Sequence, residues 1–420
     1  MKQWFTTYFS FTYTCSRKVW GLILLVGIGM LLGACKDDLT PDPNPDPDPD
    51  PDPIYADRTV LVYMAVSNLT TQADLNLADM TSAMEGVSGN LIAYVNRYPG
   101  NAVLYRINDD LTMTEVAQYG QEDPASADVL QRVWNTTLQQ FPADSYGLVM
   151  WGHATGWVPA DLNIMNQRSK PLTEEGISWS QGMERQIWKQ MPNALPTKSY
   201  GGKMEISELA SALPEGRKIE FMLFDACFMS SIEALYDLRN TAQYIIASPT
   251  EVMGNGFPYA DITPMFFQKS LNLQGICQAF VDSYRYSSSI KSASVALINT
   301  SALEPLAETV HDIYTANPDP QVDLSRVQHY ESLSYHVFYD LEDYLKQFAD
   351  GTTQFEAFQS QLAKTVVYSD CTDWIYSVYG SMFQCVDFSG ISTYAPQDVF
   401  PVYGAAHAET AWAQATGQSN

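Results

Sequence analysis

Two side chains in this sequence, His153 and Cys227, could act as a base and the nucleophile that it activates. Each comes at the end of an apolar run, His153 after 146–152 and Cys227 after 219–226. A thiol is only a few per cent ionised at neutral pH, so a cysteine nucleophile usually needs a neighbouring base or cation. A histidine at the end of one buried strand and a cysteine at the end of the next would supply that pair.

The small residues beside His153 leave room for a substrate, since Gly152 precedes it and Ala154 follows it. We expect His153 to take the proton of the Cys227 thiol and later to protonate a leaving amine. The backbone amides of Cys227 and Ala154 are the expected donors to an oxyanion. A lone histidine is more often structural and a lone cysteine is more often a small buried apolar residue, so the assignment depends on the two occurring as a pair.

The residues around Cys227 set the electrostatics that we expect for its sulfur. The pattern predicts a helix from Cys227 to Leu238, and the positive end of a helix lowers the pKa of a thiol. Asp225 lies two residues before the cysteine. Its carboxylate could accept hydrogen bonds at the strand end or project into a pocket as the counter-charge of a basic substrate side chain, and both interpretations stay open.

Strands alternate with helical stretches over residues 58–300, which predicts an α/β fold with a mostly parallel sheet. Reactive groups then belong at the carboxyl ends of the strands. We expect the polar stretch 161–203 to be a surface insertion and 301–420 to be mainly helical. The expected strands are Thr59–Val66, Leu91–Asn96, Ala102–Asn108, the run before His153, Lys218–Phe224, Tyr244–Ser248 and Ser292–Leu297, and the expected helices include Asp74–Gly86, Ala127–Phe141 and Met204–Leu213.

The N-terminus has the pattern of an export signal over residues 1–35. Basic residues precede the apolar run Gly21–Leu32, which is too short for a typical spanning helix. The segment Leu32–Cys35 resembles a bacterial lipobox, in which Cys35 becomes the lipidated first residue. The alternative is an anchor helix that contains an incidental cysteine.

Residues 36–57 form a tether that is rich in proline and aspartate, and such a segment favours extended polyproline II structure. Its first residues, Lys36–Asp38, are similar to the surface-export signal of Bacteroidetes lipoproteins. The expected location is therefore the bacterial outer membrane, with a lipid anchor and the folded part at the cell surface.

Composition excludes one class of partner and leaves cysteine pairing open. The chain has 420 residues and a formal net charge of -25 at pH 7, with no basic stripe that could meet the phosphates of a nucleic acid. Six cysteines are present, two of them (Cys15 and Cys35) in the targeting region, and the remaining four do not make a disulfide scaffold for a globular part of this size. Cys371 and Cys385 could pair in an oxidising compartment. The cysteine and histidine spacing predicts no metal site.

The two blocks that carry the candidate pair, 151–157 and 224–233, resemble the clostripain family of cysteine peptidases (family C11, clan CD). The segments 60–65 and 388–396 are similar to further parts of that family, so the resemblance extends from about Thr59 to the C-terminus. It implies a caspase-like α/β sandwich with a His–Cys dyad, cleavage after basic residues and frequent self-processing.

Residue by residue, the family dyad falls on His153 and Cys227, and the acidic residue of its specificity pocket falls on Asp225. Two departures stand out, since Ala154 replaces the usual glycine and the segment 248–256 leaves the second wall of the pocket undefined. Calcium dependence is known in the family, but no loop here has a calcium signature. Calcium is thus a cofactor that only the resemblance implies, and the resemblance implies no other.

The sequence thus predicts a surface-tethered cysteine endopeptidase that acts on proteins or peptides through a thioester and cleaves after Arg or Lys. The alternatives are a catalytically silent surface-binding lipoprotein and a clan CD peptidase with a non-basic preference. Self-cleavage is expected within the insertion, after one of five basic residues: Arg168, Lys170, Arg185, Lys189 and Lys198.

Overall fold

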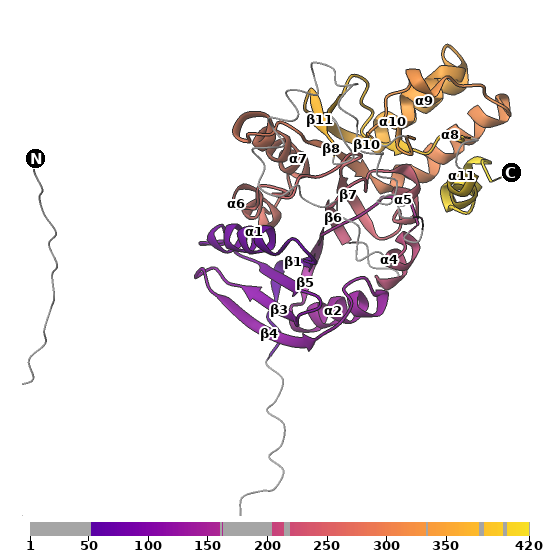
Figure 1. Cartoon of the computed structure of the whole chain (residues 1–420). Helices are drawn as coiled ribbons and strands as arrows, with labels where there is room; N and C mark the ends of the chain where they lie inside the picture. Colours follow the sequence, from indigo (N-terminus) through magenta and orange to yellow (C-terminus); the bar gives the residue numbers. More distant parts are fainter. Residues whose placement is uncertain are drawn as a thin grey trace, which may run out of the picture. The chain divides into compact units, whose positions relative to one another are not determined.

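The computed structural model describes residues 52–159, 162, 204–213, 219–332, 335–377, 382–397 and 401–419. These residues belong to one compact unit (Figure 1). The predicted signal peptide with Cys35, the tether up to residue 51 and the insertion 161–203 except Leu162 lie outside the described residues. Within the described ranges, no helix is long and apolar enough to cross a bilayer.

A nine-stranded sheet forms the centre, in the order β10-β8-β7-β6-β5-β1-β2-β3-β4. The five strands from β7 to β2 are parallel, and antiparallel strands extend the sheet at both edges. The strands of this sheet are β1 (Ala56–Ala65), β2 (Asn90–Asn96), β3 (Ala102–Ile107), β4 (Met113–Gly120), β5 (Ala143–Trp151), β6 (Ile219–Asp225), β7 (Ala242–Ala247), β8 (Ser294–Asn299) and β10 (Val366–Cys371).

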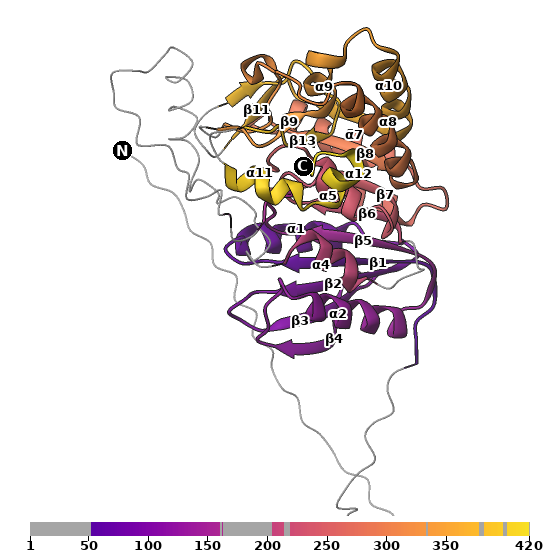
Figure 2. The same cartoon turned by 90° about the vertical axis from the view of Figure 1, so that its right-hand side faces the viewer.

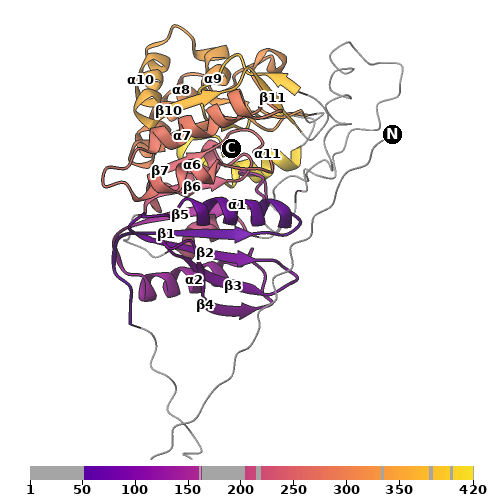
Figure 3. The same ribbon diagram turned by 90° about the vertical axis from the view of Figure 1, so that its left-hand side faces the viewer.

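Helices cover both faces of this sheet (Figures 2 and 3). Residues of α1, α6 and α7 pack in one apolar core, and residues of α2, α4, α5, α8, α9, α10 and α12 pack in the other. The α-helices are α1 (Thr70–Ser82), α2 (Ala127–Gln140), α4 (Ile206–Ala212), α5 (Ile232–Asp237), α6 (Tyr259–Ile262), α7 (Leu273–Asp282), α8 (Leu303–Ala316), α9 (Leu341–Ala349), α10 (Thr353–Thr365), α11 (Pro401–Ala408) and α12 (Ala411–Thr416).

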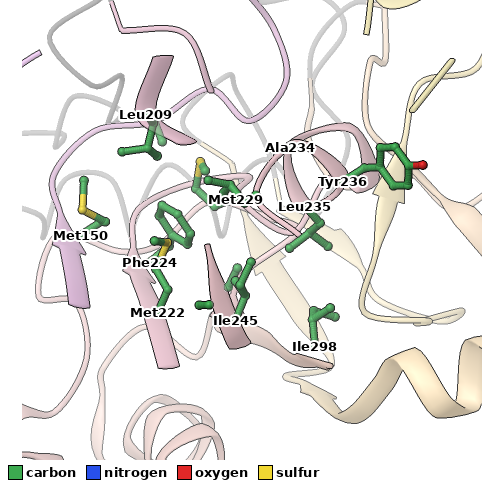
Figure 4. Close-up of a cluster of buried hydrophobic side chains, with 14 of the residues drawn as sticks. Met150, Leu209, Met222, Phe224, Met229, Ala234, Leu235, Tyr236, Ile245 and Ile298 are labelled. Atoms are coloured by element: carbon green, nitrogen blue, oxygen red, sulfur yellow. The ribbon is translucent and has the colours of Figure 1, made fainter. Parts of the chain in front are cut away.

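Side-chain alternation along the strands divides the core between the two faces. In β1, Val60, Val62 and Met64 enter one cluster, and Leu61 and Tyr63 enter the other. All five side chains are fully buried. A parallel strand that is covered on both faces has to be apolar throughout, which explains why the runs in the sequence are continuous. Figure 4 shows part of one cluster, where Phe224 of β6 lies near Met229.

The expected fold class is confirmed, with two differences in detail. The expected strands at the centre of the sheet are present, with bounds shifted by a few residues. β4 was not predicted, because Met113–Gly120 is an edge strand whose residues are exposed or half-buried and carries no apolar run. The C-terminal region, expected to be mainly helical, also supplies the edge strand β10, which pairs with β8.

Short strands after residue 320 form two small ladders outside the main sheet. β9 (Tyr339–Asp340) pairs with β13 (Ser392–Thr393), and β11 (Trp374–Tyr376) pairs with β12 (Met382–Gln384). An isolated bridge joins Ser231, directly before α5, to Ser392. The C-terminal region is therefore tied to the segment that follows β6.

Candidate active site

The register of two neighbouring parallel strands places His153 and Cys227 at the same edge of the sheet. β5 and β6 pair so that Trp151 lies opposite Asp225, and the two candidate residues each follow two positions later. The amide of Gly152 continues the ladder by donating to the carbonyl of Asp225 at 3.3 Å. The ends of β5 and β6 therefore place the two residues at neighbouring positions along this edge of the sheet.

Asn68 contacts the imidazole of His153. The Nε2 atom of His153, a residue that is 5% exposed, lies 2.7 Å from Oδ1 of Asn68. An amide oxygen can only accept, so this hydrogen bond requires a proton on Nε2 and leaves the lone pair of the neutral ring on Nδ1. The sequence analysis missed Asn68. Its place just past an expected strand is a signal for Asn68, but the sequence does not show that this strand, β1, lies beside β5.

The loop after β7 holds the sulfur of Cys227. The backbone amide of Val252 donates to Sγ at 3.3 Å, and the thiol can donate to the carbonyl of Val252 at 3.7 Å. Cys227 is only 1% exposed. The thiol is thus fixed by backbone groups of a segment that the sequence analysis described only as an undefined pocket wall.

The predicted helix over Cys227–Leu238 begins later than expected. α5 starts at Ile232, and a turn separates it from Cys227. Within this turn Phe228 has a φ of 60°, which is uncommon for a bulky residue, and its ring stacks on Phe338 at 4.5 Å between centroids. The expectation that the thiol lies at the positive end of a helix is therefore wrong, and the donor it meets is the amide of Val252.

Gly156 packs the loop after His153 against the turn after Cys227. A Cβ at this position would lie 2.6 Å from the carbonyl oxygen of Phe228 and 3.1 Å from Oγ of Ser231. The φ of Gly156 is +58°, which glycine adopts at little cost. The absence of a side chain at Gly156 thus allows the two candidate loops to touch.

Asp225 is fully buried and its carboxylate accepts hydrogen bonds. The hydroxyl of Tyr259 donates to Oδ2 at 3.0 Å, and the amide of Phe257 donates to it at 3.4 Å. Gly256 lies against the same group, because a Cβ there would be 2.3 Å from Oδ2. Burial, followed by the charge of Asp225, raises the pKa of the neighbouring Tyr284 phenol. These contacts fit the structural interpretation of Asp225 and leave its role toward substrate to be tested.

A second buried carboxylate, Glu251, directly precedes the residue that holds the thiol. Glu251 is 3% exposed, and the hydroxyl of Ser377 donates to its Oε1 at 3.3 Å. Gly256 and Phe257, two residues that contact Asp225, also line a cavity of about 500 Å³.

Among the described residues, no group of three or more His, Cys, Asp or Glu side chains is arranged to hold a metal ion.

Comparison with known proteins gives one family. The model of the clostripain family, Peptidase_C11, matches residues 62–169 and 195–402. Clostripain from Hathewaya histolytica is 23% identical over 158 residues, which are 36% of this chain and 26% of that protein. The match with this curated relative thus spans about a quarter of its length.

Solved structures match over most of their length. The inactive zymogen of a C11 protease from Parabacteroides distasonis is 30% identical, with a TM-score of 0.71, over 87% of this chain and 99% of that one. A secreted C11 cysteine protease from Bacteroides thetaiotaomicron, in complex with an irreversible peptide inhibitor, is 26% identical, with a TM-score of 0.69, over 86% of this chain and 99% of that one. Because the family model covers both loops of the site and most of the fold around them, the chain belongs to the clostripain family of cysteine peptidases.

Proposed function

We propose that this protein is an exported endopeptidase in which Cys227 is the nucleophile and His153 is its general base. The observation that carries the proposal is the pairing of β5 with β6, which brings the two residues to neighbouring strand ends. Family membership supports the same chemistry. The alternative of a catalytically silent binding lipoprotein predicts a folded chain without turnover.

The tautomer favoured by Asn68 assigns the steps of the reaction. Nδ1 of His153 takes the proton of the Cys227 thiol, and the thiolate adds to the carbonyl carbon of the scissile peptide bond. The resulting oxyanion accepts hydrogen bonds from the amides of Ala154 and Cys227. The C–N bond then breaks, the imidazolium protonates the leaving amine, and water that is deprotonated by His153 hydrolyses the thioester.

The burial of Cys227 supports a latent form of the enzyme. With 1% exposure, its sulfur is not open to a substrate carbonyl, so the groups that cover it have to move before acylation. The Parabacteroides relative was solved as an inactive zymogen. We infer that self-cleavage in the insertion 161–203 accompanies activation, with the five basic residues named above as candidate sites.

Mass spectrometry of the wild-type protein beside Cys227→Ala protein tests this activation step. A cut within 161–203 that appears only when the thiol is present supports self-processing. A chain that stays intact while it turns over peptide at full rate contradicts it.

We propose a preference for Arg or Lys before the scissile bond, with Asp225 as the counter-charge. Arg should be the better of the two, since its guanidinium can bind a carboxylate through two hydrogen bonds. The nearby Glu251 adds a second buried carboxylate on the side of Val252. Gly256 and Phe257, which lie against Asp225, also line a cavity of about 500 Å³.

A panel of fluorogenic peptides that differ only at the residue before the cut tests this preference. Asp225→Asn should lose the preference for Arg while it still cleaves other peptides. Tyr259→Phe is the matched control, because it removes a donor to Asp225 without changing the charge. If Asp225→Asn abolishes cleavage of all peptides and lowers the Tm, and Tyr259→Phe also lowers the Tm, the role of the carboxylate is structural. If the wild-type protein prefers peptides with an acidic residue or Asn before the cut, the result supports the non-basic alternative.

We further propose that lipidation of Cys35 and the tether 36–57 place the enzyme on the outer surface of a bacterial envelope. The Bacteroides relative is described as secreted, which supports export. Cys35→Ala should release the protein from the membrane fraction. Protease added to whole cells should reach the folded part, and protection from it would instead indicate a periplasmic location.

A further inference from the structure

Cys371 and Cys385 face each other at the base of the β11–β12 hairpin. Cys371 ends β10, Cys385 directly follows β12, and their sulfur atoms lie 2.8 Å apart. Sulfur atoms that are merely in contact stay well beyond this separation, whereas bonded ones lie ~2.05 Å apart. Both residues are half-buried, so a soluble oxidant can reach a pair that the fold already holds together.

The backbone around the pair is fixed by contacts on both sides. The amide of Cys385 donates to the carbonyl of Asp373 at 3.0 Å. On the other side, the guanidinium of Arg285 donates to the carbonyl of Cys371 at 2.9 Å while it bonds both carboxylate oxygens of Asp370. Neither cysteine can therefore move far from its partner without breaking this network.

The Cys385 thiol lies within hydrogen-bonding distance of the Cys371 sulfur. The hydrogen bond with Cys371 is the largest cause, ahead of burial, of the raised pKa of the Cys385 thiol. Cys277 differs, because it lies fully buried in α7 and its pKa is raised by burial. Cys277 is thus an internal control for a cysteine that does not pair.

We propose that Cys371 and Cys385 form an intramolecular disulfide in the exported protein. This proposal rests on the export proposed above, since disulfides persist in oxidising compartments. An organic disulfide, protein-borne or small, is the oxidant. Its S–S bond breaks by thiol exchange and takes up two electrons and two protons, while Cys371 and Cys385 give them up and form the new S–S bond.

The cross-link stiffens a segment that reaches the candidate active site. It closes residues 371–385 into a loop, in which the amide of Tyr376 donates to Oγ of Ser292 at 2.9 Å and Ser377 bonds to Glu251 at 3.3 Å. Glu251 adjoins Val252, the residue that holds the nucleophile. The disulfide therefore positions one wall of the site, and its loss should affect substrate binding more than the chemical step.

Peptide mapping tests the bond itself. The full chain is isolated from the bacterial envelope and denatured with N-ethylmaleimide present from lysis onward, so that buried free thiols are also blocked, and it is then digested without reductant. The expected result is a linked peptide pair that contains Cys371 and Cys385, together with alkylated Cys277. Alkylation of both Cys371 and Cys385 overturns the proposal. The assay needs no turnover, so this failure leaves the proposed peptidase activity untouched.

Variants test the positioning effect. Cys371→Ser, Cys385→Ser and the double variant should share the same lower Tm and a several-fold higher KM, with little change in kcat and no further response to dithiothreitol. Cys277→Ala is the control, which should retain the response of Tm to dithiothreitol. Equal Tm values for the wild type and the double variant, each with and without reductant, overturn the cross-link. An unchanged KM in all three variants overturns the positioning role.

Discussion

Gly156 leaves no space between the loop of His153 and the backbone of Phe228, since an added Cβ would lie 2.6 Å from the Phe228 carbonyl oxygen. This contact joins the loop of the candidate base to the turn that follows the candidate nucleophile. The relative position of His153 and Cys227 therefore depends on a glycine that takes part in no chemistry.

Gly156→Ala should lower both stability and activity. The left-handed φ costs an alanine about 1–2 kcal/mol, and the clash with Phe228 adds to this by moving one loop against the other. A displacement near 1 Å at a reacting centre can reduce kcat on the order of 100-fold. Gly351→Ala is the matched control, because Gly351 has a φ of +73° and no atom within 4 Å of its added Cβ. The measurements are the Tm and the rate of peptide turnover of both variants. Equal losses at the two sites would show that the contact between Gly156 and Phe228 does not matter for stability or activity.

Asn68→Ala should reduce kcat by ~10–100-fold, because it removes the acceptor that fixes the tautomer of His153. This range follows from the strength of a hydrogen bond to a group that becomes charged, which is about 1.5–3 kcal/mol. Asn68→Asp keeps an acceptor and adds a negative charge, so it should recover activity with a pH–rate profile shifted to higher pH. Wild-type kcat in Asn68→Ala, over the whole pH profile, would mean that His153 is oriented by other groups.

Glu233→Ala should destabilise the fold at the link between α5 and the C-terminal region. Oε1 of the buried Glu233 accepts hydrogen bonds from the amide of Tyr394 at 2.8 Å and from the hydroxyl of Thr393 at 3.0 Å. Leaving these donors without an acceptor costs about 2–4 kcal/mol in free energy of unfolding, measured by urea denaturation. Glu233→Gln keeps the oxygen and should lose less, and Glu409→Ala at an exposed position should lose nothing measurable. Similar values for the Ala variants at both sites contradict this role.

His329 should make stability depend on pH. Burial, and then the charge of His336, lower the pKa of His329 from its usual 6.5, while Glu331 partly opposes this. As the pH falls, the unfolded chain therefore binds a proton at His329 before the folded chain does. The stability that comes from the neutral, buried imidazole is fully present above pH 6.5 and is lost as the pH drops below that value. The fall cannot exceed about 1.4 kcal/mol per pH unit for one proton.

His329→Asn is the variant that tests this, because its amide can replace the Nδ1–H donor to the Glu331 carbonyl without titrating. The free energy of unfolding of the variant should be less sensitive to acid than that of the wild type. Burial raises the pKa of Asp340 to about 6, which acts in the opposite direction in both proteins, so the difference between the two curves is the measurement. If the free energy of unfolding of the two proteins changes in parallel between about pH 7 and 5, His329 does not contribute to the pH dependence of stability.

The sequence predicted the central strands and the places where His153 and Cys227 leave them, because strands buried on both faces are continuous apolar runs. It did not predict β4, whose residues are too exposed to leave such a run. It also placed the helix after Cys227 too early. Nothing in the composition of that stretch indicates that Phe228 adopts a left-handed backbone conformation. In the structure the ring of Phe228 stacks on Phe338, a residue far away in the sequence.

The contacts of Asn68 and Val252 could not be predicted in the same way. Both residues lie in loops far from the candidate pair along the chain, and they reach it because β1 and β7 flank β5 and β6 in the sheet. Strand order decides which loops meet, and a single sequence does not contain it. The sequence left open whether Cys371 and Cys385 pair, because the short distance between their sulfur atoms depends on the β11–β12 hairpin, which the pattern did not reveal.

Covalent labelling of the thiol tests the central claim most directly, namely that His153 activates Cys227. Full-length protein, after incubation that allows self-processing, is treated with an irreversible thiol-directed peptidyl probe, and the modified residue and its labelling rate are measured by mass spectrometry. Cys227 should be labelled in parallel with the loss of turnover, and His153→Ala should slow this labelling on the order of 100-fold or more. Labelling of Cys227 at the same rate in His153→Ala protein, or turnover by folded Cys227→Ala protein, would contradict the account.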